Sequence, residues 1–232
     1  QSYKDSVFSM STLAHELGHS MHHHLIAQHQ KPVYNGLAAV WRSSSVAETA
    51  SNFHQAMLRT WLRSERGEDD ELMLAIVDEA MMNYHRYCFL MPTLARFELE
   101  VCRRAEAGEP LNAPILGQIM NGYFSEGFGD ALTDDPARSA VTWAQFQHLY
   151  RPFYTFQYAV GISAASIAAD RIHASEPGAV EQYLAMLRAG YSLPAIDVFS
   201  VAGIDMTSTA PVESMFSRLE DLVSQLEERA GR

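Results

Sequence analysis

Apolar residues recur every three or four positions along most of the chain, whereas strict alternation of apolar and polar residues is scarce. The first such stretch begins near Asp5 or Ser6 and ends before Pro32, and its apolar positions are Met10, Leu13, Leu17, Met21 and Leu25. Residues spaced in this way lie on one face of an α-helix. The pattern therefore predicts a mainly α-helical protein with little β structure.

Serine, glycine and proline divide the rest of the helical pattern into further segments. The serines at 43–45 are placed to cap a second helix that ends near Gly67. Residues 70–107 predict one long helix or two, with a kink or break at Pro92. The stretch 122–140 is rich in Gly, Asp and Pro, which predicts a mobile loop. A last helix is indicated by an apolar stripe of Val212, Met215, Phe216, Leu219, Leu222, Val223 and Leu226.

The 232 residues carry 28 acidic and 17 basic side chains, which gives a net charge of −11. Such a chain repels phosphate backbones and anionic membranes, so we expect neither nucleic acid nor a membrane as its partner. Apolar runs such as Leu37 to Trp41 and Phe89 to Met91 fall far short of the ~20 residues that span a bilayer. Cys88 and Cys102 fall about 21 Å apart on one predicted helical stretch, too far for a disulfide. Two free thiols favour a cytoplasmic location.

Residues 15–19 read His-Glu-Leu-Gly-His, a pattern for which the composition predicts roughly 0.03 chance occurrences. On a helix, His15 and His19 share one face about 6 Å apart along the axis, so both imidazoles can reach one metal ion. Glu16 lies beside them and is placed to bind a water held by the metal, which is the position of the general base in a metallohydrolase. The alternative is a surface helix that is merely rich in histidine, since three more follow at 22–24.

A catalytic zinc ion has three protein ligands and one open position, so the motif predicts a third ligand elsewhere in the chain. His22 shares the helix face but lies about 10.5 Å along the axis from His15, too far for one tetrahedral ion. Glu48 is the candidate, because it falls among apolar residues on a helix face that we expect to be buried. A metal ion would compensate the charge of a buried carboxylate. The alternative is an ion pair of Glu48 with Arg42 or Arg59.

A second candidate cluster lies in residues 143–158, of which seven are aromatic. Tyr154 and Tyr158 are spaced to share a helix face, and His148 lies shortly upstream. Hydroxyl and imidazole donors directed at a metal-polarised carbonyl would stabilise the oxyanion that forms there. The alternative is an ordinary aromatic core.

These segments resemble the oligoendopeptidase F branch of the thimet oligopeptidase family of zinc metallopeptidases. The matching stretches are specific in combination, occur in the family's order and cover nearly the whole chain. They are Leu13 to His22, Val46 to Ser51, Arg96 to Glu100, His148 to Tyr154, Gln157 to Ala165 and Ala202 to Thr207.

The resemblance implies a helical zincin-type catalytic domain that binds one zinc ion and hydrolyses short oligopeptides inside a deep channel. By the same resemblance, the zinc ligands are His15, His19 and Glu48, the general base is Glu16, and the residues near the substrate are His148, Tyr154 and Tyr158. Of these, His148 and Tyr154 look like the pair that stabilises the tetrahedral intermediate. Two positions depart from the family: Gly161 stands where the thimet branch has a further tyrosine, and His54 replaces an asparagine of the closer branch.

Members of this family are much longer than this chain, and their metal-binding helix follows a long N-terminal helical region. We therefore expect residues 1–232 to be the C-terminal catalytic region of a longer enzyme whose N-terminal half is missing here. The leading hypothesis is a zinc-dependent endopeptidase that acts on short oligopeptides. The alternatives are a zinc module closed by a fourth ligand such as His22 or His54, an inactive half-enzyme that needs the missing region, and a metal-free helical protein.

Overall fold

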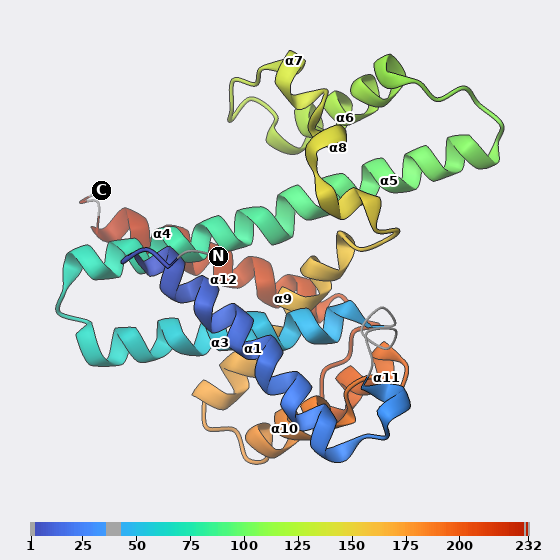
Figure 1. Cartoon of the computed structure of the whole chain (residues 1–232). Helices are drawn as coiled ribbons and strands as arrows, with labels where there is room; N and C mark the ends of the chain where they lie inside the picture. Colours follow the sequence, from blue (N-terminus) through green and yellow to red (C-terminus); the bar gives the residue numbers. More distant parts are fainter. Residues whose placement is uncertain (1–2, 36–42, 230, 232) are drawn as a thin grey trace. The chain divides into compact units, whose positions relative to one another are not determined.

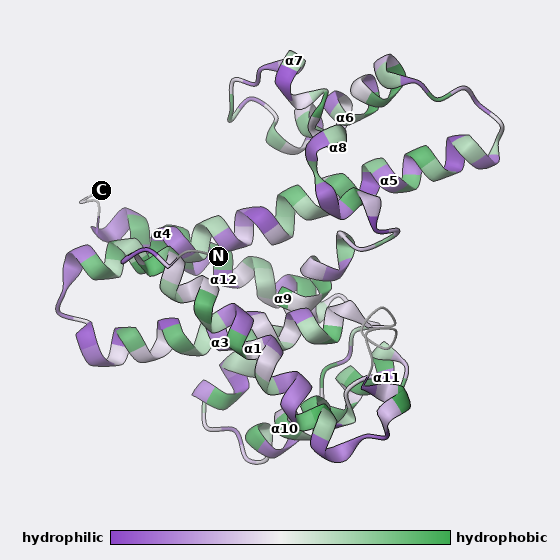
Figure 2. Ribbon diagram, in the orientation of Figure 1, coloured by the Kyte–Doolittle hydropathy of each residue, from purple (hydrophilic) through white to green (hydrophobic). Residues whose placement is uncertain are grey.

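The computed structural model describes residues 3–35, 43–229 and 231, and these residues form helices joined by turns and loops, with no β-strand among them (Figure 1). The mainly α-helical fold predicted from the sequence is confirmed. The chain divides into two compact units, one of residues 1–84 with 160–232 and one of residues 85–159. Hydrophilic and hydrophobic residues are interspersed along the helices (Figure 2).

Helix α1 (Val7–His29) has the bounds that the sequence predicts. Its N-cap is Ser6, whose hydroxyl accepts a hydrogen bond from the backbone N–H of Ser9 at 3.2 Å. The helix ends before the short 3₁₀ turn η1 (Pro32–Tyr34). The apolar run from Leu37 to Trp41 lies outside the described residues.

Helix α3 (Ser44–Arg66) confirms the second predicted helix, with Gly67 as its C-cap residue. Ser43 is the N-cap residue of this helix, as expected from the serines at 43–45, but its side chain makes no cap hydrogen bond. Every residue from 43 to 53 is buried, so packing against neighbouring helices holds this end of α3 in place of a cap.

The main hydrophobic core of the first unit lies between α3 and three later helices, α9 (Phe156–His173, of which residues 160–173 belong to this unit), α10 (Ala179–Ala189) and α11 (Ala195–Val201). Helix α1 packs along α3 from another side. In the N-terminal half of α3, polar side chains are buried together with apolar ones. The buried members of the core are Val46, Ala50, Phe53, Ala164, Ala165, Ala168, Ala169, Tyr183, Met186, Leu187, Val198, Phe199, Ala202 and Ile204.

Two further helices complete the first unit, α4 (Asp70–Tyr84) and α12 (Ala210–Arg229), and they pack against each other. The predicted last helix is confirmed, and its apolar stripe buries Met215 and Leu222. A smaller core of Leu62, Met73 and Ile76 joins α3 to α4.

The second unit begins with the π-helical segment η2 (His85–Leu90) and continues through α5 (Met91–Glu106), α6 (Ala113–Phe128), α7 (Pro136–Ser139), α8 (Thr142–Gln145) and the 3₁₀ turn η3 (Gln147–Tyr150). The break expected near Pro92 is confirmed: η2 interrupts the α-helix, which restarts with Pro92 in its first turn. Cys88 on η2 and Cys102 on α5 are both free thiols, as predicted.

The loop predicted for residues 122–140 is wrong over its first part, because α6 continues through it. Asn112 caps the first turn of α6 through its side-chain oxygen, and Met120 and Phe124 bury one face. A glycine inside a helix costs about 1 kcal/mol, less than the burial of such side chains contributes. Only residues 129–135 remain outside helices before α7 begins.

Candidate metal centre

His15 and His19 on α1 meet Glu48 on α3 within the first unit. The Nε2 atom of His15 lies 3.5 Å from Oε2 of Glu48, and the Nε2 atom of His19 lies 3.8 Å from the same oxygen. The three donor atoms all lie within 4.8 Å of one another. Ligand bonds to zinc are about 2.0–2.2 Å long, so one ion can be reached by all three side chains after small adjustments. The structure therefore brings together the three predicted metal ligands.

Two glycines let three helices approach closely at this point. A methyl group at Gly18 of α1 would lie 2.6 Å from the carbonyl oxygen of Ala50 on α3, and a methyl group at Gly161 of α9 would lie 2.6 Å from Cβ of Glu48. Neither space admits a side chain. Gly161, which departs from the thimet branch, thus lies where α9 packs directly on the backbone that carries Glu48.

The carboxylate of Glu48 is buried, with 3% of the residue exposed. It accepts a hydrogen bond from the hydroxyl of Ser51 at 3.2 Å, which stabilises the charge only in part. The ion pair considered with Arg59 is not formed, since Arg59 binds Glu79 instead, and Arg42 lies outside the described residues. A buried carboxylate facing two imidazoles fits a bound cation.

A chain of buried hydrogen bonds fixes the tautomer of His15. Arg59 donates to both carboxylate oxygens of Glu79, at 2.7 and 3.0 Å. Ser11 donates its hydroxyl hydrogen to Glu79 at 2.5 Å and accepts from the amide nitrogen of Gln55 at 2.8 Å. The remaining amide oxygen of Gln55 lies 2.9 Å from Nδ1 of His15, so Nδ1 carries the hydrogen. In neutral His15, the Nε2 lone pair then faces Glu48, as metal binding requires.

His19 is held in its neutral form as well. Burial, followed by the nearby His15 and His23, lowers the pKa of His19 to about 4. A neutral imidazole is the form that binds a metal ion, so at neutral pH the site needs no proton removed from His19 first.

Neither histidine that would close a four-ligand site belongs to the donor group found among the described residues. His22 is fully buried and packs edge-on against Tyr191, with ring centroids 5.4 Å apart. His54 places its Nδ1 2.9 Å from the carbonyl oxygen of Ala50, one turn back along α3. The part of the chain described by the structure therefore offers three ligands, which leaves a position for solvent or substrate.

Glu16 follows His15 on α1, and its side chain is exposed. It is not part of the donor group. This separation suits a residue that exchanges protons with water rather than binding the metal, and its role as general base stays a prediction.

His148, Tyr154 and Tyr158 form a cluster within the second unit. The Nε2 atom of His148 lies 3.1 Å from the hydroxyl of Tyr158, and the three ring centroids are 5.4 to 5.6 Å apart. Burial, followed by the positive charges of Arg86 and Arg151, lowers the pKa of His148. The ring is therefore neutral near pH 7 and can donate only from the nitrogen that carries its hydrogen.

The two tyrosines do not share a helix face, which corrects the expectation drawn from their spacing. Tyr154 precedes α9, and only Tyr158 lies on that helix. The turn before α9 places Phe153 at a φ of 54°, and the backbone N–H of Phe153 donates to Glu98 at 2.7 Å. This turn, rather than helical spacing, brings the rings together, and Tyr87 stacks on Tyr158 with centroids 4.9 Å apart.

Sequence reasoning missed the residues that support these clusters, chiefly Gln55, Ser11, Glu79 and Glu98. Helical spacing could have indicated one of them, because Ser11 lies one turn before His15. Gln55 likewise lies two turns after Glu48, on the helix face that carries the ligand. The polar contacts with Glu79 and Glu98 join distant segments and left no local pattern.

The helices and the site together define a class of protein: a helical scaffold that presents the His-Glu-x-x-His motif on one helix and a buried glutamate on another as a three-donor metal group. The sequence matches the profile of peptidase family M3 over residues 6–218. The chain belongs to peptidase family M3.

Named relatives agree with this assignment and with the resemblance to oligoendopeptidase F. The chain is 32% identical to oligopeptidase PepF of Bacillus subtilis (strain 168), over 97% of this chain and 33% of the relative. It is 29% identical to an oligoendopeptidase F homolog of Lactococcus lactis subsp. lactis (strain IL1403), over 97% of this chain and 36% of the relative. The crystal structure of oligoendopeptidase-F from Enterococcus faecium superposes with a TM-score of 0.79 at 30% identity, over 97% of this chain and 40% of that one.

The chain thus spans about a third of the length of the relatives that it matches. The helical fold class is confirmed by the likeness to the Enterococcus faecium structure. None of the helices in the described part of the chain is long and apolar enough to cross a membrane.

Proposed function

We propose that this chain is the catalytic region of a zinc-dependent endopeptidase that hydrolyses internal peptide bonds of short oligopeptides. The observation that carries the proposal is the convergence of His15 and His19 on the buried carboxylate of Glu48. The names of the relatives, oligopeptidase and oligoendopeptidase F, support peptide substrates. Imidazole and carboxylate donors in this number favour zinc among the divalent ions.

A bound zinc ion would polarise the scissile carbonyl and lower the pKa of a water molecule. Glu16 takes a proton from the attacking water as the water oxygen bonds to the carbonyl carbon. The same carboxylic acid then returns the proton to the amide nitrogen as the C–N bond breaks, so Glu16 ends each cycle ionised. Its exposure on α1 leaves it accessible to water and substrate.

We propose that the cluster of His148, Tyr154 and Tyr158 stabilises negative charge on the carbonyl oxygen of the substrate. As the carbonyl carbon becomes tetrahedral, negative charge builds on that oxygen, and hydrogen bonds that strengthen at this stage accelerate the reaction. His148 and Tyr154 supply the donors in this proposal, and Tyr158 orients His148 through their 3.1 Å contact.

The alternative of a purely structural zinc site requires a fourth protein ligand, and the group of three among the described residues gives it no support. The alternative of an inactive half-enzyme supposes that hydrolysis also needs a region corresponding to the two thirds of the relatives that this chain does not match. It is tested by measuring hydrolysis with this chain and with a longer polypeptide that includes the preceding region.

The variant Glu16→Gln tests the assignment directly, with Glu65→Gln as the matched control because Glu65 is also an exposed glutamate on a helix of the first unit. Zinc content and cleavage of a quenched fluorescent peptide are measured on the same samples, in a polypeptide that hydrolyses the peptide in its wild-type form. We expect Glu16→Gln to keep its zinc and lose hydrolysis, and Glu65→Gln to keep both. Undiminished turnover by Glu16→Gln would reject the base, and wild-type protein that fails to bind zinc would reject the metal centre.

A further inference from the structure

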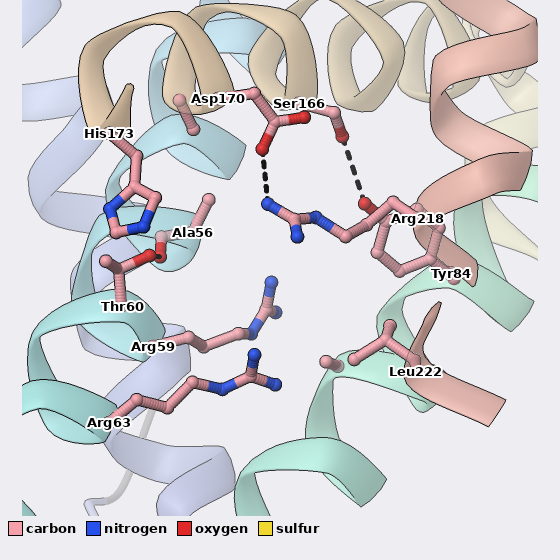
Figure 3. Close-up of a pocket in the computed structure, with 12 residues that line it drawn as sticks. Ala56, Arg59, Thr60, Arg63, Tyr84, Ser166, Asp170, His173, Arg218 and Leu222 are labelled. Atoms are coloured by element: carbon pink, nitrogen blue, oxygen red, sulfur yellow. Dashed lines mark hydrogen bonds and ion pairs between the residues drawn. The ribbon is translucent and has the colours of Figure 1, made fainter. Parts of the chain in front are cut away.

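A polar pocket lies between α3, α4, α9 and α12 of the first unit, apart from the metal centre (Figure 3). Arg59 and Arg63 enter it from α3, and Arg218 enters it from α12. Figure 3 shows the three guanidinium groups directed into one space. The pocket contains about 60 Å³ of free space, whereas a single water needs about 10–15 Å³ on the same measure. A group of a few heavy atoms therefore fits inside.

The charges that line this pocket do not cancel. Arg59 is paired with Glu79, and Arg218 is paired with Asp170. No described residue forms a hydrogen bond or an ion pair with the guanidinium group of Arg63, although this side chain is half-buried. One guanidinium charge is thus left without a partner in a protein whose net charge is −11.

The environment of Arg63 disfavours its charge and so favours an anion beside it. The pKa of Arg63 is lowered, first by burial and then by the positive charges of Arg218, Arg59 and Arg229. Arginine nevertheless remains protonated in proteins. An anion in the pocket would relieve both the desolvation and the repulsion, and five N–H donors in a planar fork suit two oxygens of one acid group.

The other polar groups of the pocket do not take the place of such an anion. The hydroxyl of Tyr84 lies 3.0 Å from that of Ser166, and the Ser166 hydroxyl donates to the carbonyl oxygen of Ile162. Thr60 donates its hydroxyl hydrogen to the carbonyl oxygen of Ala56. The donors still available therefore come from the arginines and from the imidazole of His173.

We propose that the pocket bounded by Arg59, Arg63 and Arg218 binds a small oxyanion, a phosphate group or a carboxylate. Arg63 is its main ligand, because Arg59 and Arg218 each already hold a carboxylate and can contribute only their remaining N–H groups. This pocket shares Arg59 with the hydrogen-bond chain that ends at His15, but its binding of an anion does not depend on the proposed peptidase activity.

Titration of the zinc-free chain with inorganic phosphate and, separately, with acetate tests the proposal by calorimetry at constant ionic strength. We expect saturable binding at one site per chain. Tighter binding of phosphate than of acetate would identify a phosphate site, and the reverse would identify a carboxylate site. If neither anion gives saturable binding, the proposal is wrong.

Variants identify the ligand. Arg63→Gln should weaken binding about tenfold or more, since a hydrogen bond to a charged group is lost. Arg66→Gln is the matched control, because Arg66 lies on the same helix but outside the pocket, and it should change affinity less than about twofold. Arg63→Lys keeps the charge and loses the planar fork, so an intermediate affinity is expected even if Arg63→Gln folds poorly. Equal affinities for Arg63→Lys and wild type, or equal effects at positions 63 and 66, would overturn the assignment.

Discussion

Replacement of Gln55 by Leu tests whether the buried hydrogen-bond chain prepares His15 to bind a metal. The amide oxygen of Gln55 accepts from Nδ1 of His15 at 2.9 Å, and its nitrogen donates to Ser11 at 2.8 Å. Leucine has a similar size and provides neither bond. Nδ1 of His15 then loses the partner that selects its tautomer and orients its ring.

The size of the effect follows from the burial of Gln55. Removal of the hydrogen-bond partner of a metal-binding histidine typically costs about 10–100-fold in metal affinity. At about 1.4 kcal/mol per tenfold change, this is about 1.4–2.8 kcal/mol of binding free energy. Only 4% of Gln55 is exposed, so water cannot readily replace the lost acceptor, and we expect a value in the upper half of that range. Gln55→Glu keeps an acceptor for Nδ1 and should bind zinc within about threefold of wild type.

Zinc affinity is measured near neutral pH by competition with a chromophoric chelator, on samples whose helicity matches wild type by circular dichroism. Gln118→Leu is the control, because Gln118 is an exposed glutamine on α6 of the other unit and should leave the affinity unchanged. If Gln55→Leu binds zinc as tightly as wild type does, the hydrogen-bond chain does not act on the metal centre, and Gln55 contributes to folding alone.

Three further predictions follow from the helix contacts, the buried histidine and the aromatic cluster. Gly161→Ala forces a methyl group to within 2.6 Å of Cβ of Glu48 and should destabilise the fold by about 1–3 kcal/mol in urea unfolding, whereas Gly122→Ala, with open space around it, should not destabilise it. Burial, with His23 and His19 adding to it, lowers the pKa of His22 to about 3, below the value of 6.5 expected in the unfolded chain. The free energy of unfolding, measured in the presence of a chelator, should therefore fall as the pH drops from 6.5 towards 3, by up to about 1.4 kcal/mol per pH unit from this group. His22→Leu should lose that part of the slope, and equal slopes for the variant and wild type would contradict the assignment. In a polypeptide that hydrolyses peptides, Tyr154→Phe should lower kcat on the order of 10²-fold with little change in KM, and a change confined to KM would make Tyr154 a binding residue instead.

The helices of the first unit could be predicted from the sequence because the helical spacing of their apolar residues stops at the Ser, Pro and Gly residues that lie near their ends. Ser6 and Pro32 bound α1, and Gly67 ends α3. The same reasoning failed at residues 122–140, where the composition indicated a loop. Buried side chains on α6 outweigh the low helix propensity of its glycines there, and burial depends on tertiary contacts that local composition does not contain.

The meeting of His15, His19 and Glu48 could be predicted because the motif is local and because a lone acid on a buried helix face needs a compensating charge. The geometry of the aromatic cluster could not be derived from the spacing of Tyr154 and Tyr158. The turn before α9 depends on a bond from Phe153 to Glu98, which is 55 residues away in the sequence. Spacing in the sequence predicts which residues are neighbours within one helix, but it does not predict a turn that is held by a hydrogen bond to a distant segment.

The positions of Gly18 and Gly161 explain how a site built only from helices can place its donor atoms closely. Ligands on loops can adjust to an ion, whereas ligands on packed helices depend on the distance between the helix backbones. At Gly18 and Gly161 the neighbouring backbone or Cβ atoms come closer than any side chain allows. Glu48 lies where α9 packs closely on α3, and Ala50 and Ser51, two and three residues further along, lie where α1 packs closely on it. The short reach of Glu48 to His15 and His19 is therefore a consequence of helix packing. It follows that substitutions at these two glycines should weaken metal binding even though neither residue can contact the metal.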